Sequence, residues 1–332
     1  RDEIAASLGR DPGEIVYTSG GSEADNLAVR GVLAAVGGVA VCSAGEHHAV
    51  LEPVEHAGGV TVGLESDGAV APDRLAAVLD RLDDVRLVSI IAVNNETGAV
   101  NDLDALVEVT RRHAPDALVH TDAVQAVPWI DVAAATSACD LVSVTGHKVG
   151  GPVGQGVLVV GERARLEPLI VGGGQEQGRR AGTPAVALAS SFAAALTVTT
   201  DRRLAEVQRL TGLRDRLLDG LVEALDDDLH VTIAGDGRRV AGGIAHVCLR
   251  DVDAEALLFL LDADGVRASS ASSCSSGAQQ LSHVLTAMDM PVEWARGSLR
   301  LSLGWTSTDA DVARALEVIP AAVARVRAFD GG

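Results

Sequence analysis

The sequence predicts an α/β fold in which a mostly parallel sheet, covered by helices, is followed by a smaller α+β domain. Two observations lead to this prediction. Between about residues 14 and 160, short apolar runs alternate with segments of helical periodicity, which is typical of a parallel sheet whose strands are buried on both faces. After about residue 184, long helical patterns and a few separate strands replace this alternation.

Seven apolar runs are expected to form the strands of the large domain. They are EIVYTS (14–19), GVAVCSA (38–44), GVTVGLE (59–65), VRLVSIIAVN (85–94), ALVHTDA (117–123), DLVSVTG (140–146) and QGVLVVG (155–161). Apolar residues at helical spacing between these runs predict helices near 23–36, 47–57, 72–82 and 102–113.

The second half of the chain predicts a different arrangement. A long helix is expected over about 184–226, broken or bent near Thr199–Asp201. The later elements are expected to be strands at 229–235, 243–250 and 298–304, a helix over 253–265 and a C-terminal helix from about 308. We therefore expect a large domain over residues 1–205 and a small C-terminal domain over 206–332.

The composition limits the classes of partner. The chain of 332 residues has a formal net charge of −19, which argues against nucleic-acid backbones and anionic membranes. The sequence has no uninterrupted apolar run of about 18 residues and no secretory leader, so we expect a cytoplasmic protein. It begins with RDEIAASLG, without an initiator Met, and an N-terminal segment is therefore expected to be missing.

Four cysteines are scattered along the chain without a C-x-x-C pair, which argues against a disulfide framework and a metal site. Cys42, Cys139 and Cys248 lie inside apolar runs, and we expect them to be buried structural thiols. Cys274 differs, because it lies in ASSASSCSSGAQQ, a polar stretch of small residues. Since an exposed free thiol is liable to oxidation, a merely tolerated surface cysteine is the less attractive interpretation.

Polar residues follow five of the predicted strands. The five turns are TSGGSE, GEHH, NNETG, HTDAVQ and TGHK. Because ligands of open parallel sheets bind at the carboxyl ends of the strands, we expect these turns to converge on one site.

The turn TGHK contains Lys148, the single lysine of the chain, since the other 26 of the 27 Lys and Arg residues are Arg. One interpretation is that this lysine survived by chance in an arginine-rich composition. The alternative is chemical, because an amine can lose its proton and form a Schiff base with a carbonyl group, whereas Arg stays protonated.

Three further side chains at the strand ends favour the chemical interpretation. Asp122 can keep a pyridine-type nitrogen protonated, with Gln125 placed to contact a ring oxygen; alternatively Asp122 caps a turn. His47, at a strand-to-helix turn, can stack on a ring or move protons, or it is a helix-start residue without chemical consequence.

A phosphate site and a carboxylate site are also indicated. Gly20 and Gly21 turn the chain and expose backbone N–H groups, and Ser22 opens a helix whose N-terminus favours an anion, although Ser22 can equally be an N-cap paired with Asp25. Arg300 can clamp a carboxylate, or it is an ordinary strand residue. Lys148 together with these groups forms the set that a pyridoxal 5'-phosphate enzyme needs.

The chain resembles the cysteine desulfurases, which are fold-type I pyridoxal phosphate enzymes of the class V aminotransferase family. Eight motifs occur in the order of the family: TSGGSEADNLAVRG, EHHAVLE, VNNETG, HTDAVQAV, TGHKVGGPVGQG, GGGQEQGRRAGT, SSASSCSSG and SLRLSLG. The resemblance covers essentially the whole chain. The length of the loop around Cys274 matches the branch of the family with a long catalytic loop.

The resemblance implies a role for each of these residues. Lys148 would carry the cofactor, Asp122 and Gln125 would contact its ring, and His47 would stack on it and assist proton transfer. The phosphate would be held by Gly21, Ser22, Thr145 and His147, and by Thr183 from the partner subunit of a homodimer. The substrate L-cysteine would be bound through its carboxylate by Asn95 and Arg300. The nucleophile Cys274 would become a persulfide and pass its sulfur to an acceptor or scaffold protein for iron–sulfur cluster assembly or thiolation.

The chain departs from the family pattern in several places. Ser22 stands where Thr is usual, Ala271-Ser272-Ser273 precedes Cys274 in place of Gly-Ser-Ala, and Gln177 replaces an Arg. Two other functions therefore stay open. One is a selenocysteine lyase or cysteine β-lyase, and the other is a truncated, non-catalytic homologue that binds partner proteins.

Overall fold

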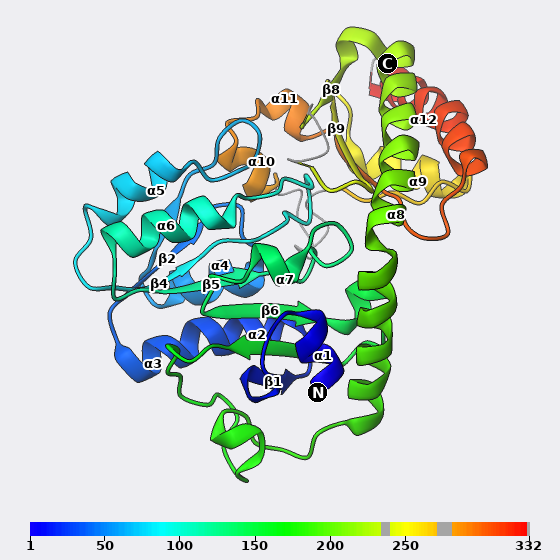
Figure 1. The fold of residues 1–332 in the computed structure, drawn as a ribbon. Coiled ribbons are helices and arrows are strands. Elements are labelled where there is room, and N and C mark those ends of the chain that lie inside the picture. The colour runs from blue at the N-terminus through cyan, green and yellow to red at the C-terminus, as the bar shows by residue number, and fades with distance from the viewer. Residues whose placement is uncertain (234–239, 271–280, 331–332) are drawn as a thin grey trace. The chain divides into compact units, whose positions relative to one another are not determined.

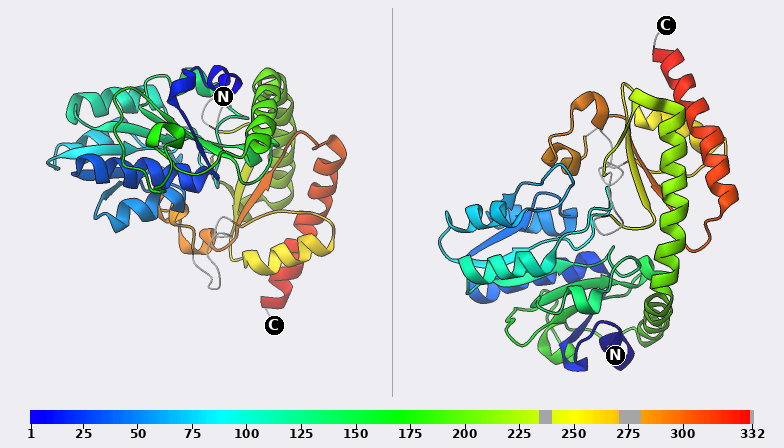
Figure 2. Two further views of the ribbon diagram at one scale, coloured as in Figure 1. Left: turned by 90° about the horizontal axis from the view of Figure 1, so that it is seen from below. Right: turned by 45° about the horizontal axis from the view of Figure 1, so that its top comes forward.

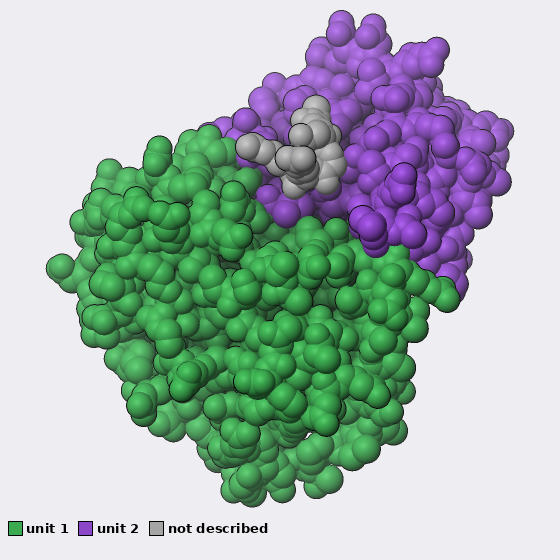
Figure 3. Space-filling model, in the orientation of Figure 1, with its two compact units in different colours: residues 1–65, 69–94, 101–203 green, residues 66–68, 95–100, 204–332 purple. Residues whose placement is uncertain are grey.

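A computed structural model describes residues 1–233, 240–270 and 281–330 of the chain. The chain divides into two compact units (Figure 3). Unit 1 comprises Arg1–Glu65, Ala69–Asn94 and Asn101–Arg203, and unit 2 comprises Ser66–Gly68, Asn95–Val100 and Leu204–Gly332. This division differs from a single boundary near residue 205, because two short segments of the first half of the chain belong to unit 2.

A seven-stranded sheet forms the centre of unit 1, and each of the seven expected strands contributes to it (Figure 1). The strands are β1 (Ile15–Thr18), β2 (Val39–Ser43), β3 (Val60–Val62), β4 (Val85–Ser89), β5 (Leu118–Asp122), β6 (Leu141–Thr145) and β7 (Gly156–Val160). Their order is β1-β7-β6-β5-β4-β2-β3. Only the two pairings of β7 are antiparallel, so the sheet is mostly parallel, as the alternation of strands and helices predicts.

Helices cover both faces of this sheet (Figures 1 and 2). One face carries α2 (Gly21–Asn26), η2 (Leu27–Gly31), α3 (Val32–Val36) and α4 (His48–His56). Apolar side chains of these helices form one buried cluster with Leu87, Leu118 and Leu141 of the sheet. The helices α5 (Pro72–Leu79) and α6 (Leu103–His113) pack against each other on the opposite face.

The face covered by α2 and α4 changes character along the strands. Side chains two residues apart on a strand point to the same face, so Leu118, His120 and Asp122 of β5 share this one. Leu118 belongs to the apolar cluster, whereas His120 and Asp122 are buried polar residues nearer the carboxyl end. This face of the sheet is therefore apolar toward the amino end of β5 and polar toward its carboxyl end.

The helix α8 (Val186–Leu225) runs for 40 residues without interruption, so the break expected near Thr199–Asp201 is absent. Threonine hydroxyls in this stretch donate hydrogen bonds to carbonyl groups one turn back, Thr197 to Ala193 at 3.0 Å and Thr200 to Leu196 at 2.9 Å. These bonds satisfy the threonine hydroxyl groups within the helix, although threonine hydroxyls can also favour turns by bonding to the backbone. The residues of α8 up to Arg203 belong to unit 1, and the later ones belong to unit 2.

Unit 2 contains a three-stranded antiparallel sheet in the order β10-β9-β8. Its strands are β8 (Leu229–Val231), β9 (Ile244–Leu249) and β10 (Ser298–Ser302), and its longer helices beyond α8 are α9 (Ala254–Ala263) and α12 (Asp309–Asp330). The two helices pack against each other (Figure 1). This is the α+β arrangement that the second half of the sequence predicts.

Short helices complete the two units. They are α1 (Asp2–Ser7), η1 (Pro12–Glu14), α7 (Val132–Ala135), η3 (Gly146–Val149), η4 (Gln175–Gly178), η5 (Asp226–Asp228), α10 (His283–Ala287) and α11 (Val292–Ala295). In the part of the chain that the structure describes, no helix combines the length and the apolar character needed to cross a membrane.

Candidate active site

The turn after β1 brings two glycines to the carboxyl end of the sheet. Gly20 precedes α2 and Gly21 is the first residue of that helix, whose first backbone N–H groups have no partners within the helix. A Cβ atom added to Gly21 would lie 2.6 Å from Cγ2 of Val124. The turn after β1 therefore lies directly against the turn after β5, and its helix N-terminus favours an anion.

Thr145 and His147 lie beside the same turn. Thr145 is the buried last residue of β6, and its Oγ1 lies 3.2 Å from Nδ1 of His147 and donates a hydrogen bond to the carbonyl oxygen of Gln155 at 3.1 Å. A Cβ atom on Gly20 would lie 3.9 Å from this hydroxyl. The hydroxyl group of Thr145, the imidazole of His147 and the N-terminus of α2 at Gly21 thus lie side by side, and these three residues are called the cup below.

Asp122 ends β5 and is buried, with 3% of its surface exposed. Its Oδ1 accepts a hydrogen bond from the backbone N–H of Val124 at 2.8 Å. Burial raises the pKa of Asp122 to about 6, although the N–H of Val124 and the charge of Lys148 both lower it. A buried acid in this position is suited to pair with a protonated ring nitrogen.

Lys148 lies in η3, directly after β6. Because β5 and β6 are neighbouring parallel strands, their carboxyl ends bring Asp122 and Lys148 to the same edge of the sheet. The positive charge of Lys148 lowers the pKa of Asp122, and burial together with that charge lowers the pKa of His147. The amine is therefore within electrostatic reach of both the acid and the cup.

His47 and Ser22 line a shared open groove with a volume of about 730 Å³. His47 is the N-cap of α4, and its Nδ1 accepts a hydrogen bond from the N–H of Ala49 at 3.1 Å, so the neutral ring carries its proton on Nε2. Ser22 lies inside α2, whose N-cap is Gly20. The interpretation of Ser22 as an N-cap is therefore wrong.

Gln125 and Thr183 lie in irregular segments. Gln125 is half-buried in the turn after β5, and Thr183 is exposed between η4 and α8. The segment of Thr183 is linked to α2, which follows the turn after β1, because Nε of Arg180 donates a hydrogen bond to Oε1 of Glu23 at 2.8 Å. The other carboxylate oxygen of Glu23 accepts a hydrogen bond from the N–H of Ser19, also at 2.8 Å.

Asn95 and Arg300 lie together in unit 2. Arg300 belongs to β10, and its NH1 group donates a hydrogen bond to the backbone carbonyl oxygen of Asn95 at 2.7 Å. Its Nε is buried and has no hydrogen-bond partner among the described residues. Because an unsatisfied buried donor is costly, this atom is suited to a carboxylate ligand.

The sequence matches known proteins over nearly its whole length. Residues 1–315 match the family model of the class-V aminotransferases. The IscS-like cysteine desulfurase of Mycobacterium tuberculosis is 42% identical over 98% of this chain and 85% of that protein. The cysteine desulfurase IscS of Methanosarcina thermophila is 37% identical over 98% of this chain and 81% of that protein. This chain belongs to the cysteine desulfurases of the class-V aminotransferase family.

Solved structures resemble the desulfurase chain closely. A NifS-like protein superposes with a TM-score of 0.89 at 27% identity, covering 98% of this chain and 86% of the other. DndA from Streptomyces lividans gives a TM-score of 0.74 at 34% identity, covering 91% and 86%. These likenesses confirm the predicted fold-type I architecture. Since the family depends on pyridoxal 5'-phosphate, the chain is an enzyme that uses this cofactor.

The residues at the carboxyl edge of the sheet fit this cofactor. The cup formed by Gly21, Thr145 and His147 offers the backbone N–H groups of a helix N-terminus, which suit a phosphate group. Asp122 offers a carboxylate for the pyridine nitrogen, and Lys148 offers an amine for the aldehyde.

Of the four cysteines in this desulfurase, Cys274 lies outside the described residues, as does the altered sequence Ala271-Ser272-Ser273 before it. The other three, Cys42, Cys139 and Cys248, are buried and free, as expected. Burial raises the pKa of Cys139 to about 12 and that of Cys248 to about 11. Since the thiolate is the nucleophilic form, these two thiols are inert near neutral pH.

Sequence interpretation missed a group of buried polar residues beside Asp122. They share exposed fractions of 1% or less and are Asp25, Glu46, Ser89, His120 and Ser143. One of them, His120, could have been found from the run LVHTDA. His120 and Asp122 are two residues apart on the predicted strand and must therefore share a face of the sheet.

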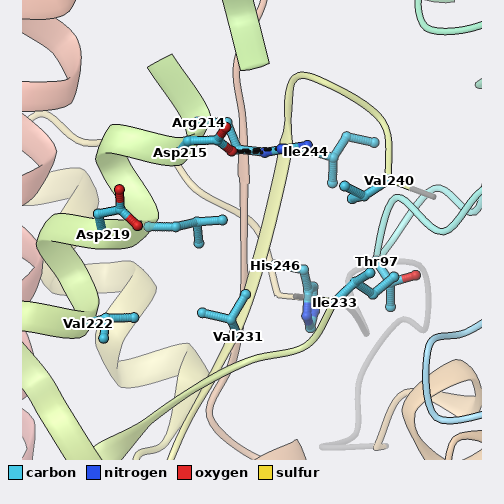
Figure 4. Close-up of a pocket in the computed structure, with 11 residues that line it drawn as sticks. Thr97, Arg214, Asp215, Asp219, Val222, Val231, Ile233, Val240, Ile244 and His246 are labelled. Atoms are coloured by element: carbon cyan, nitrogen blue, oxygen red, sulfur yellow. Dashed lines mark hydrogen bonds and ion pairs between the residues drawn. The ribbon is translucent and has the colours of Figure 1, made fainter. Parts of the chain in front are cut away.

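A second cavity, of about 230 Å³, lies within unit 2 of the desulfurase (Figure 4). Arg214 and Asp215 form an ion pair at 2.7 Å on its α8 side, and His246 of β9 lies on its other side. Burial lowers the pKa of His246 to about 3, so its ring is neutral. None of the predicted active-site residues that the structure describes lines this cavity.

Proposed function

We propose that this enzyme converts L-cysteine to L-alanine, retains the sulfur as a persulfide on Cys274 and passes it to an acceptor protein. The placement of Lys148 and Asp122 at the ends of neighbouring parallel strands, beside the cup at Gly21, carries this proposal. The names of its relatives support L-cysteine as the substrate, because they are cysteine desulfurases.

Bound pyridoxal phosphate supplies an aldehyde for the amino group of the substrate and a ring that withdraws electrons from the substrate's bonds. In our proposal Lys148 would hold the aldehyde, Asp122 would keep the ring nitrogen protonated and Gln125 would contact the ring oxygen. The phosphate is held by Gly21, Ser22, Thr145 and His147.

The substrate is oriented by its carboxylate. The buried Nε of Arg300 is available as a donor for this group, while the NH1 of the same side chain is held by Asn95. In our proposal His47 moves protons through Nε2; the backbone hydrogen bond that Nδ1 accepts supports this role, because it leaves Nε2 to carry the proton.

Sulfur leaves the substrate by attack of the Cys274 thiolate on the substrate sulfur. A sulfur–sulfur bond forms, the carbon–sulfur bond breaks, and its electron pair stays on the substrate carbon. That carbon takes up a proton, which gives alanine, and the transferred sulfur remains on Cys274. The low exposure and the raised pKa of Cys139 and Cys248 support Cys274 as the nucleophile.

We propose that the enzyme is a homodimer in which Thr183 completes the phosphate site of the partner subunit. Thr183 is exposed, and Val171 and Val186 near it are 77% and 75% exposed, which supports a protein contact over this segment. The acceptor serves iron–sulfur cluster assembly or thiolation. The proposed location is the cytoplasm, where free thiols stay reduced.

Product analysis with Cys274→Ala tests the proposal. We expect cofactor-loaded parent protein to release alanine from L-cysteine and the variant to release none. The matched control is Cys248→Ala, which removes a buried thiol and should retain alanine release. Pyruvate formed independently of Cys274 would instead identify a β-lyase, and turnover of L-selenocysteine alone would identify a selenocysteine lyase. Absence of every product despite bound cofactor would contradict an enzymatic function.

A further inference from the structure

A row of buried polar side chains crosses three strands beside Asp122. Nδ1 of His120 on β5 lies 2.8 Å from Oγ of Ser89 on β4, and its Nε2 lies 3.0 Å from Oγ of Ser143 on β6. Ser89 and His120 are register partners, as are Asp122 and Ser143. Because directly paired residues share a face of the sheet, the row adjoins the acid that faces the cofactor.

Asp25 of α2 completes the row at Ser143. Its side chain is 1% exposed, and a hydrogen bond links it to Ser143. Its Oδ1 lies 3.7 Å from Nε2 of His120 and has no hydrogen-bond partner among the described residues. The helix α2 therefore contributes the phosphate cup at Gly21 and, one turn later, a buried acid on the same face of the sheet.

Three buried carboxyl groups repel one another at this edge, those of Asp25, Glu46 and Asp122. Other titratable groups around this edge include Lys148 and His147 of η3, His47 before α4 and His120 of β5. Burial, followed by the charge of Asp122, raises the pKa of Asp25 well above its ordinary value, and burial lowers the pKa of His120 to about 3. A second buried charge next to Asp122 is therefore disfavoured.

The direction of the hydrogen bonds in the row depends on the charge of Asp25. If Asp25 is protonated, it donates to Ser143, Ser143 donates to Nε2 of His120, and Nδ1–H of His120 donates to Ser89. If Asp25 is ionised, Ser143 donates to the carboxylate, Nε2–H donates to Ser143, and Nδ1 accepts from Ser89. The tautomer of His120 consequently reports whether Asp25 is protonated on the oxygen that faces Ser143 and donates to that hydroxyl.

We propose that Asp25 and His120 are positioning residues of the cofactor site, and that Asp25 stays protonated at the end of this row and donates a hydrogen bond to Ser143. Of the pair Asp25 and Asp122, only Asp122 then carries the charge that the cofactor nitrogen needs. The inference rests on the proposed function, because it concerns the cofactor that this function requires.

The tautomer of His120 is measured by NMR of the protein carrying isotope-labelled histidine, with and without cofactor, and His120→Gln identifies the signals. We expect the proton on Nδ1 in the parent. Asp25→Asn should preserve this tautomer, because the amide N–H replaces the acid O–H as the donor to Ser143. A proton on Nε2 in the parent would overturn the proposal.

The second measurement is the pH dependence of the absorbance of bound cofactor, together with its dissociation constant. Asp25→Asn should leave the pH midpoint in place and keep the dissociation constant within about twofold, whereas Asp25→Ala should raise that constant about tenfold. Asp122→Asn is the reference that shifts the midpoint. An equal shift in Asp25→Asn, or parental affinity in Asp25→Ala, would refute the proposal.

The two readouts separate this proposal from the proposed function. If the parent binds no pyridoxal phosphate, the proposed function fails, and the tautomer still decides whether Asp25 donates a hydrogen bond to Ser143. If the parent binds cofactor and His120 carries its proton on Nε2, only the role of Asp25 is refuted.

Discussion

Glu96 accepts a hydrogen bond from the hydroxyl of Ser282, and the two side chains are buried together in unit 2 although 186 positions separate them in the sequence. Ser282 is also the N-cap of α10, where its Oγ accepts the N–H of Leu285 at 3.1 Å. Glu96 directly follows Asn95, which holds Arg300. The buried acid Glu96 thus lies between the segment that accepts the hydrogen bond of Arg300 and the start of α10.

Replacement of Glu96 by Gln should stabilise the protein at neutral and alkaline pH. Burial raises the pKa of Glu96 from 4.5 to about 7, although the hydrogen bond of Ser282 and the charge of Arg300 lower it. A raised carboxyl pKa favours folding below pH 4.5, and this contribution is lost as the pH rises through 7. The free energy of unfolding of Glu96→Gln should therefore exceed that of the parent by up to about 3 kcal/mol above pH 7.

Urea unfolding of the parent and Glu96→Gln between pH 4.5 and 8 measures this difference. We expect the difference in the free energy of unfolding between Glu96→Gln and the parent to grow with rising pH and to become constant above the pKa of Glu96. Glu255→Gln, at an acid in the first turn of α9, is the control and should give no such trend. A gap that does not vary with pH would contradict the buried, neutral state of Glu96.

Arg300→Lys should weaken substrate binding more than it slows turnover. Lysine keeps the charge but loses the planar fork, so it cannot hold Asn95 and a carboxylate in the same geometry. We expect the KM for L-cysteine to rise about tenfold to a hundredfold. Steady-state kinetics check this, with Arg314→Lys as the control, since Arg314 forms an exposed pair with Glu317. An unchanged KM would exclude Arg300 from carboxylate binding.

Glu23→Gln should lower the affinity for the cofactor. Burial raises the pKa of Glu23, but hydrogen bonds from Arg180 and Ser19 outweigh it, so the pKa lies below its ordinary value and the group is charged. The neutral amide loses this charge-assisted pairing and loosens the turn that leads to Gly21. The dissociation constant of pyridoxal phosphate should rise about tenfold, as for the loss of one hydrogen bond to a charged group.

Glu108→Gln is the matched control for that change. Glu108 also pairs with an arginine, Arg112, but both side chains are exposed and lie on α6, so the loss should be small. Equal affinities in Glu23→Gln and Glu108→Gln would show that the pair of Glu23 and Arg180 does not support the cofactor site.

The elements of the fold could be predicted because each carries a local signal. Apolar runs such as DLVSVTG are long enough to identify a buried strand, and the polar residues that follow this run predict the edge of the sheet at which a ligand is expected. The assignment of Asn95–Val100 to unit 2 could not be predicted, because it depends on pairing with residues such as Val240 that are far away in the sequence.

The buried row at His120 escaped prediction for a related reason. A histidine within an apolar run fits a structural role as well as a functional one, and its partners Ser89 and Ser143 lie on neighbouring strands. Strand order decides which polar residues meet, and the sequence does not state that order. Asp25 was interpreted as part of a helix cap, whereas burial against the sheet directs it to Ser143.

Subunit mixing tests whether Thr183 acts across a dimer. Lys148→Ala and Thr183→Ala should each load little cofactor when assembled alone. If a site combines Lys148 of one subunit with Thr183 of the partner, a mixed dimer has one site with both residues intact. Refolding the two variants together in equal amounts should then restore about a quarter of the parental loading, since half of the dimers are mixed and each has one complete site. If Thr183 acts within its own subunit, no mixed dimer contains a complete site, and loading stays at the level of the separate variants.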